Sequence, residues 1–218
     1  MGKTELQLRR EIIAQCLAMN AAGLNSGVAG NVSARFGDRM LITPSGTDYA
    51  ETTPEMIASI DLGDPDGAWD GPLKPSSEWR FHQAILAARP DVEAIVHAHP
   101  IYCTALAMAR KPIPAAHYMV AIFGGEDVRC SGYATFGTQA LSDEAVAALK
   151  GRTACLLANH GMITLGASLE KAMWRATELE VLAQQYCVSL TIGGPVVLDS
   201  AAIDETLAKI ATYGKQDS

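Results

Sequence analysis

Ala94-Ile95-Val96-His97-Ala98-His99-Pro100 is a compact apolar run that carries two histidines and ends in a proline. Its length and composition predict a buried strand over 94–99, and Pro100 is suited to the first turn of a following helix. Side chains two positions apart in a strand project to the same face of a sheet. His97 and His99 are therefore expected to lie next to each other.

Two distant motifs add further side chains of the kind that bind metals. Glu78 lies in Pro75-Ser76-Ser77-Glu78-Trp79, and His160 lies in Asn159-His160-Gly161. Neutral imidazoles together with a carboxylate are a ligand set for Zn²⁺ or a similar divalent ion. A His-x-His pair alone is more often structural. A third histidine and a glutamate in turns of small residues favour a metal site with an open position, which is typical of catalysis.

Apolar periodicity and turn residues divide the rest of the chain into short strands and helices. One helix is expected to have Ser76 or Ser77 as its cap and Glu78 in its first turn, and to end before Pro90. Another helix is expected to run from Ser142 to Gly151. Further helices are expected over 4–22, 101–109, 168–186 and 201–211, and strands over 31–36, 39–43, 154–158 and 162–165, with two short strands within 113–136.

The domain organisation follows from this order of elements. No repeat, low-complexity stretch or linker interrupts residues 1–218, so a single domain is expected. Hydrophobic residues make up 49% of the chain and charged residues 19%, which is enough apolar material for a core. The expected fold class is α/β, with a mostly antiparallel central sheet flanked by helices on both sides.

Composition also excludes several classes of partner. The formal net charge is −7, which argues against nucleic acid because no basic excess exists to pair with phosphates along a backbone. No apolar run is long enough to span a bilayer, and the polar start lacks the apolar segment of a signal peptide. The five cysteines are widely spaced and include no CxxC pair, so we expect reduced thiols and a cytoplasmic protein.

Three segments could together hold a small anion. Gly30-Asn31 and Ser45-Gly46 lie in glycine-containing loops that can bring backbone N–H groups close to a phosphate. Ser76 and Ser77 are expected at a helix N-terminus, where unpaired N–H groups favour negative charge. Each segment alone is a weak signal. Because the two serines directly precede Glu78, an anion bound there would lie beside the metal, as a small phosphorylated substrate requires.

In this order the motifs resemble the class II aldolase/adducin-head family over nearly the whole chain. The matching segments are 29–33, 42–46, 75–82, 97–99, 117–119, 133–138, 159–161 and 212–214. The resemblance implies a three-layer fold and a homotetramer with active sites between subunits. It implies Zn²⁺, or another ion such as Co²⁺ or Mn²⁺, on His97, His99 and His160, with Glu78 as the fourth ligand.

The same resemblance implies roles for the remaining candidate residues. Phosphate contacts are implied for Gly30, Asn31, Ser45, Gly46, Ser76 and Ser77. Tyr118, from an adjacent subunit, would attend the aldehyde oxygen, and Tyr213 would close over the site. Phe123 is apolar and is expected near the aldehyde tail.

The implied reaction is reversible cleavage of a ketose 1-phosphate to dihydroxyacetone phosphate and a short aldehyde. L-fuculose 1-phosphate, or a 5-deoxy- or 5-methylthio-pentulose 1-phosphate, would fit this chemistry. Glu78 would serve as the acid and base, and the metal would stabilise the enediolate. No Schiff-base lysine is needed, in agreement with motifs that contain none except Lys74 just upstream.

Other activities on the same scaffold remain as alternatives. The family resemblance also covers methylthioribulose-phosphate dehydratases and sugar-phosphate 4-epimerases and decarboxylases. Epimerases carry an acidic residue soon after the position of His117, whereas none precedes Glu126 here. A non-catalytic adducin-like interaction domain would be expected to have lost its metal ligands, all of which this chain retains. A metal-dependent hydrolase would need a metal-activated water and would turn over phosphate esters.

Overall fold

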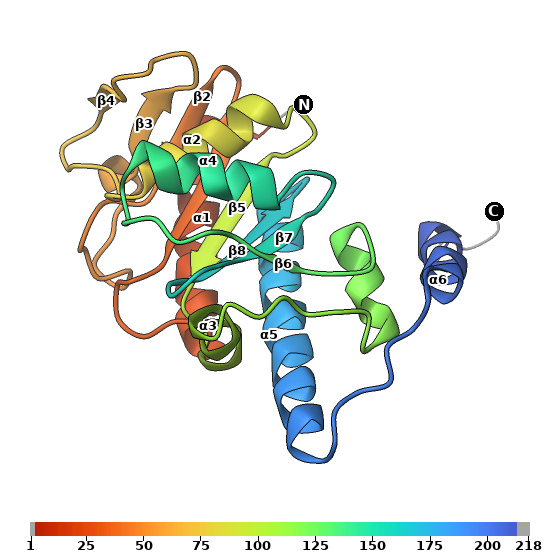
Figure 1. Cartoon of the computed structure of the whole chain (residues 1–218). Helices are drawn as coiled ribbons and strands as arrows, with labels where there is room; N and C mark the ends of the chain where they lie inside the picture. The colour runs from red at the N-terminus through yellow and green to blue at the C-terminus, as the bar shows by residue number, and fades with distance from the viewer. Residues whose placement is uncertain (1–2, 213–218) are drawn as a thin grey trace.

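The computed structural model describes residues 3–212 and is organised around one sheet (Figure 1). The strand order across the sheet is β4-β3-β2-β1-β5-β8-β7-β6. The strands are β1 Asn31–Phe36, β2 Arg39–Ile42, β3 Ala58–Asp61, β4 Trp69–Asp70, β5 Ala94–Ala98, β6 Arg129–Cys130, β7 Ala154–Leu157 and β8 Gly161–Gly166. Every neighbouring pair is antiparallel except β6 and β7, which are parallel. The expected mostly antiparallel sheet of an α/β fold is confirmed.

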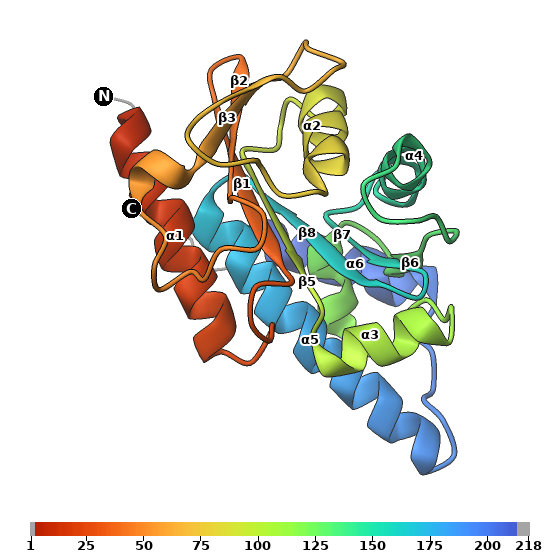
Figure 2. The ribbon, with the colours of Figure 1, turned by 90° about the vertical axis from the view of Figure 1, so that its left-hand side faces the viewer.

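Helices cover both faces of this sheet (Figure 2). One face carries α2 and α4, and the other carries α1, α3 and α5, while α6 lies at the side and contacts the short 3₁₀ helix η2. The helices are α1 Glu5–Ala21, α2 Trp79–Ala88, α3 Ile101–Met108, α4 Gln139–Ala148, α5 Leu169–Thr191 and α6 Ser200–Thr212, with the 3₁₀ helices η1 Pro54–Met56 and η2 Tyr118–Phe123.

The alternation of strand side chains separates two hydrophobic cores. In β5, Ile95 packs with Phe81 and Ile85 of α2 on one face of the sheet. Val96, the next residue, belongs to the core on the opposite face, under α1 and α5. His97 then returns to the α2 face, where its ring makes an edge contact with Phe81 at 5.3 Å between centroids. The period of two along β5 therefore places His97 on the face of the sheet that α2 covers.

The expected starts of two helices are wrong. Neither Ser76 nor Ser77 caps α2, because Glu78 itself occupies the N-cap position and makes no side-chain cap. The α4 helix begins at Gln139 rather than at Ser142, because the hydroxyl oxygen of Thr138 accepts a hydrogen bond from Leu141 N and caps the helix earlier. In α4 the cap therefore decides where the helix starts, more than the apolar period does.

The region 113–136 forms less strand than expected. It contains β6, a single bridge between Ile113 and Val128, and the 3₁₀ helix η2 in place of two strands. Ile113 lies between Pro112 and Pro114, which have no N–H groups to donate to a neighbouring strand. The side chain of His117 instead caps η2 by accepting from Met119 N.

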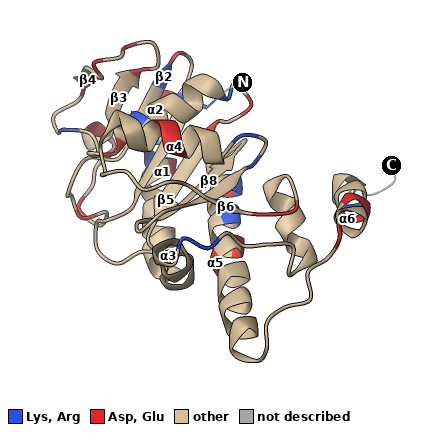
Figure 3. Ribbon diagram, in the orientation of Figure 1, with Lys and Arg blue, Asp and Glu red and all other residues tan. Residues whose placement is uncertain are grey.

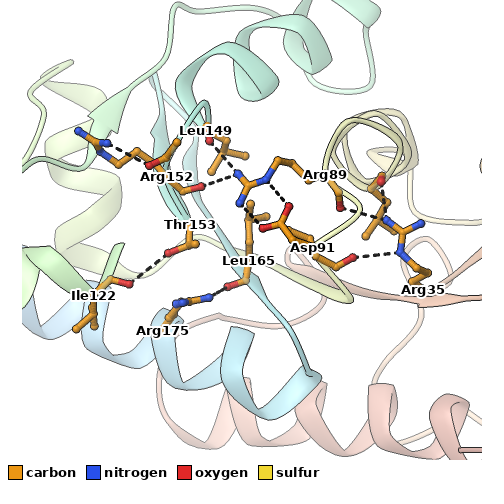
Figure 4. Close-up of polar contacts among 12 residues, drawn as sticks. Arg35, Arg89, Asp91, Ile122, Leu149, Arg152, Thr153, Leu165 and Arg175 are labelled. Carbon is orange, nitrogen blue, oxygen red and sulfur yellow. Dashed lines mark hydrogen bonds and ion pairs between the residues drawn. The ribbon is translucent and has the colours of Figure 1, made fainter. Parts of the chain in front are cut away.

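Arginines tie together the end of the molecule remote from the histidines (Figure 4). The guanidinium of Arg89 pairs with Asp91 at 2.8 Å and donates to the backbone oxygens of Leu149 and Arg152. Arg175 of α5 donates to Leu165 O at 2.7 Å. These bonds satisfy carbonyl groups at strand and helix ends, so the arginines hold the sheet to the helices on both its faces.

Charged side chains are scattered over the ribbon rather than gathered by sign (Figure 3). Lys and Arg lie on several separate elements, interspersed with Asp and Glu. Among the described helices, none has both the length and the apolar character needed to cross a membrane.

Candidate active site

Neighbouring strands at the centre of the sheet bring the candidate ligands together. Asn31 of β1 is the cross-strand partner of His97 of β5, and His97 also pairs with Ile163 of β8. His160 lies directly before β8, after Asn159, whose positive φ of 55° makes the turn. The start of α2 lies over this end of the sheet and supplies Glu78. Residues more than 80 positions apart in the sequence therefore meet at one point.

The three imidazoles and the carboxylate face one another at short range. The Nε2 atoms of His97 and His99 lie 2.9 Å apart. Glu78 reaches His97 Nε2 with Oε2 at 3.1 Å and His160 Nε2 with Oε1 at 3.2 Å. The histidine ligand atoms all lie within 4.8 Å of one another. The site expected from His97, His99, His160 and Glu78 is therefore assembled within one chain.

This donor set fits a divalent transition metal. His97 Nδ1 donates to Met162 O at 2.9 Å, which leaves the Nε2 lone pair of His97 directed at the other ligands. Glu78 Oε1 is buried without a hydrogen-bond partner among the described residues, which a positive ion beside it would satisfy. Three imidazole nitrogens and one carboxylate are the ligands of a Zn²⁺-type site rather than of Ca²⁺ or Mg²⁺.

Burial keeps His99 and His160 neutral, as metal binding requires. Burial, with the neighbouring His97, lowers the pKa of His99 and of His160 to about 4. Burial acts to raise the pKa of Glu78, but the nearby His97 and His160 and a hydrogen bond from Asn31 outweigh it and hold that pKa well below its usual range. At neutral pH the site therefore presents unprotonated imidazoles at His99 and His160 and an ionised carboxylate at Glu78.

Protein stripped of metal by a chelator is expected to lose stability as the pH falls from about 6.5 towards 4. Burial lowers the pKa of His82 from 6.5 to about 3 in the folded chain, so the unfolded state binds more protons across this range. Each such histidine contributes a slope of up to about 1.4 kcal/mol per pH unit. Urea unfolding at pH 7, 6 and 5 measures the slope, and equal stability at pH 7 and 5 would contradict the assignment.

A pocket of about 330 Å³ opens beside the ligands. Its walls are Ala29, Ser77, Glu78, His99, Tyr133, Ala134, Phe136, Asn159 and His160. Tyr133 and Phe136 are more than half exposed there, although their sequence motif indicated no role for them. Phe123, which the sequence placed near the aldehyde tail, is instead fully buried in the core under α5. The aromatic wall of the site therefore comes from the loop that precedes α4.

Two of the expected anion-binding segments lie side by side. Ser76 N donates to Thr43 O at 2.9 Å, and Ser45 N donates to Lys74 O at 3.0 Å. The loop of Ser45 and Gly46 therefore runs next to the two serines that precede Glu78. Of these four residues only Ser77 lines the pocket of the single chain.

Gly30 and Asn31 lie at the start of β1, next to the strand that carries His97. A Cβ at Gly30 would lie 2.7 Å from His97 O. Only a glycine therefore lets the backbone at position 30 lie this close to the backbone of His97. The Nδ2 of Asn31 donates to Glu78 Oε2 at 2.9 Å.

Of the two expected tyrosines, Tyr118 lies among the described residues. Tyr118 is 52% exposed at the start of η2 and does not line the pocket of its own chain. Tyr213 lies outside the described residues.

Comparison with known proteins agrees with this geometry. Residues 10–187 match the family model described as "Class II Aldolase and Adducin N-terminal domain". A Rhodospirillum rubrum 5-methylthioribulose-1-phosphate/5-deoxyribulose-1-phosphate aldolase is 50% identical over 98% of this chain and 96% of its own length. An L-fuculose phosphate aldolase of Escherichia coli K12 is 49% identical over 95% of this chain and 96% of its own.

A solved structure extends the likeness to three dimensions. An L-fuculose 1-phosphate aldolase superposes with a TM-score of 0.90 at 37% identity, covering 97% of this chain and 98% of the other. The matched model, the relatives that span the whole length and the shared fold show that the chain belongs to the class II aldolase and adducin family.

Proposed function

We propose that this protein is a metal-dependent aldolase that reversibly cleaves a ketose 1-phosphate to dihydroxyacetone phosphate and a short aldehyde. The observation that carries the proposal is the convergence of Glu78 with three imidazoles beside an open pocket that Glu78, His99 and His160 line. Relatives about 50% identical over nearly the whole chain are named as aldolases of such substrates, which supports the same reaction here.

Zn²⁺ is the proposed ion, held by His97, His99, His160 and Glu78. When bound, it supplies the positive charge that stabilises the enediolate left by cleavage of the bond between C3 and C4. Glu78 holds and returns the proton at the enediolate carbon, for which its place between the ligands and the pocket suits it. The rigid strand beneath His97 and His99 fixes their orientation, because His97 is bonded to β8 through Met162 O.

The phosphate is proposed to bind where the Ser45-Gly46 loop runs beside Ser76 and Ser77. This end of α2 has no side-chain cap. Trp79 N donates to Ser76 O, but the next N–H groups of the first turn have no side-chain acceptor and can serve an anion. Gly30 and Asn31 complete the expected set from β1. The support for this placement is the adjacency of the two loops, which the hydrogen bonds of Ser45 and Ser76 fix.

The substrate is proposed to end in an apolar group. Tyr133, Ala134 and Phe136 give the pocket an apolar wall next to Glu78 and His160. L-fuculose, 5-deoxyribulose and 5-methylthioribulose share a terminal methyl or thioether group in place of a hydroxyl. Such an end leaves no polar atom without a partner against this wall.

The protein is further proposed to act as a cytoplasmic homotetramer in which Tyr118 of a neighbouring subunit serves the aldehyde oxygen. Large apolar side chains stay exposed in the single chain around α3 and the end of α5, among them Ile101, Val188, Ile192 and Val196. A surface of this kind is typical of protein–protein contacts. Tyr118 is exposed and does not line the pocket of its own chain, which supports a role across such a contact.

The experiment offers the Zn²⁺-loaded protein fuculose, 5-deoxyribulose and 5-methylthioribulose 1-phosphates. Release of dihydroxyacetone phosphate is followed with a coupled dehydrogenase. Release that a chelator abolishes and Zn²⁺ restores is the expected result, and the three rates rank the aldehydes. If the metal is bound stoichiometrically but no substrate is cleaved, the aldolase assignment fails in favour of dehydration or epimerisation on the same scaffold.

A further inference from the structure

A line of four buried polar side chains runs from the middle of the sheet to the metal-binding carboxylate. It consists of Ser33 and Asn31 of β1, His82 of α2, and Glu78, none of which is more than 8% exposed. Ser33 Oγ lies 2.7 Å from His82 Nδ1, and His82 Nε2 lies 2.5 Å from Asn31 Oδ1. Asn31 Nδ2 lies 2.9 Å from Glu78 Oε2. Nothing in the proposed chemistry uses Ser33 or His82.

The chemistry of the groups fixes the direction of every hydrogen bond in this line. An ionised carboxylate only accepts, so Asn31 must turn its NH₂ group towards Glu78 and its oxygen towards His82. His82 must then carry its proton on Nε2 in order to donate to that oxygen. Nδ1 is therefore unprotonated and accepts from the hydroxyl of Ser33. The four residues form one line of donors that ends on Glu78.

The ring of His82 has little freedom to leave this arrangement. It is completely buried and stacks on Phe81, with ring centroids 4.6 Å apart and planes inclined by 22°. Phe81 in turn contacts the ring of His97. Asn31 can hold Glu78 in a single orientation only while its amide is prevented from turning over. His82 provides that restraint by donating to the other end of the amide.

We infer that His82 and Ser33 are positioning residues that hold the amide of Asn31, and through it the carboxylate of Glu78, in the orientation that binds the metal. The inference rests on the proposed role of Glu78. Outer partners of metal ligands of this kind alter affinity by about 10- to 100-fold when they are removed. Ser33 and His82 would thus act on the metal without touching it.

The test measures Zn²⁺ affinity by competition with a chromophoric chelator, with no substrate present. His82→Leu, which removes the donor, is expected to weaken binding by about 10- to 100-fold. His82→Gln places an amide N–H near the position of Nε2 and is expected to restore most of the affinity. In an Asn31→Ala background, His82→Leu is expected to add no further loss, because its effect passes through Asn31.

A matched pair of serines keeps the test independent of whether the leucine variant folds. Ser33→Ala removes the hydrogen bond to His82 and is expected to lower the affinity for Zn²⁺. Ser59→Ala removes a hydroxyl that is equally buried in the same sheet but has no partner among the described residues, and is expected to leave the affinity unchanged. Thermal unfolding of each metal-free variant reports any general damage to the fold.

Several results would overturn the inference. Native Zn²⁺ affinity in a folded His82→Leu or Ser33→Ala protein would overturn it. So would a double variant of Asn31→Ala and His82→Leu that loses as much affinity as the two single losses multiplied together. Equal losses of Zn²⁺ affinity in Ser33→Ala and Ser59→Ala would show that both serines act only through packing in the core. The proposed reaction is tested separately. If the protein cleaves its substrate but the losses of Zn²⁺ affinity in the two variants are independent, only this inference is refuted. A protein with the expected affinities but no aldol cleavage refutes only the reaction.

Discussion

Glu78→Gln is expected to abolish proton exchange at the enediolate carbon of dihydroxyacetone phosphate, with a fall in rate of about 10²- to 10⁴-fold. Glutamine keeps the size and one acceptor oxygen of the side chain but cannot take up a proton. The measurement follows loss of the proton signal of dihydroxyacetone phosphate in D₂O by NMR. It needs no aldehyde, so the prediction does not depend on which sugar phosphate is the substrate.

The control for this variant separates the loss of a base from the loss of the metal. Glu78 is also a proposed ligand, so exchange is measured at saturating Zn²⁺ and the bound metal is quantified in each protein. Glu55→Gln removes an exposed carboxylate of η1, which packs beside α1 and does not line the pocket, and is expected to exchange at the native rate. Exchange in a metal-loaded Glu78→Gln protein within a few-fold of native would assign the base to another residue.

The histidine cluster could be predicted from the sequence because local geometry determines most of it. Side chains two positions apart in a strand point to the same face of the sheet, whatever the rest of the fold. This rule predicts that His97 lies beside His99. Glu78 was expected in the first turn of α2 and lies one position earlier, at the N-cap. That difference depends on how the loop of Ser76 bonds to Thr43, a contact between segments more than 30 residues apart. The helix propensity of a short stretch of sequence carries no information about such a long-range contact.

Other parts of the site depend on packing that the sequence does not display. Phe123 and Phe136 are both aromatic residues near glycines, yet one is fully buried and the other borders the pocket. Phe123 is buried because it lies in η2, whereas Phe136 lies in the loop before α4. The strand expected in this region is reduced to one bridge at Ile113, because the prolines on either side of Ile113 have no N–H group to donate. His82 was expected only to pack or to form a hydrogen bond. Its link to Glu78 appears only when β1 and α2 are placed together.

Gly161→Ala is expected to disrupt the metal site while leaving most of the fold in place. A Cβ at this position would lie 2.5 Å from Cδ2 of His99 and 2.6 Å from Ala98 O. The backbone of β5 is held between β1 and β8, so Ala98 has little room to move and the ring of His99 must turn away. Loss of one of three imidazole ligands is expected to weaken Zn²⁺ binding by at least about 100-fold, with aldol cleavage falling in parallel.

Two measurements and a matched glycine decide whether this steric argument holds. The Zn²⁺ affinity and the rise in melting temperature on adding Zn²⁺ should both fall in Gly161→Ala, because a ligand stabilises only as far as it binds the native state. Gly63→Ala makes the same substitution in an exposed loop, where the new Cβ meets only the side chain of Asp61 at 3.3 Å, and should keep both values. A Gly161→Ala protein that binds Zn²⁺ as tightly as the native chain would show that the backbone of Ala98 and the ring of His99 accommodate the new Cβ, and the steric argument would fail.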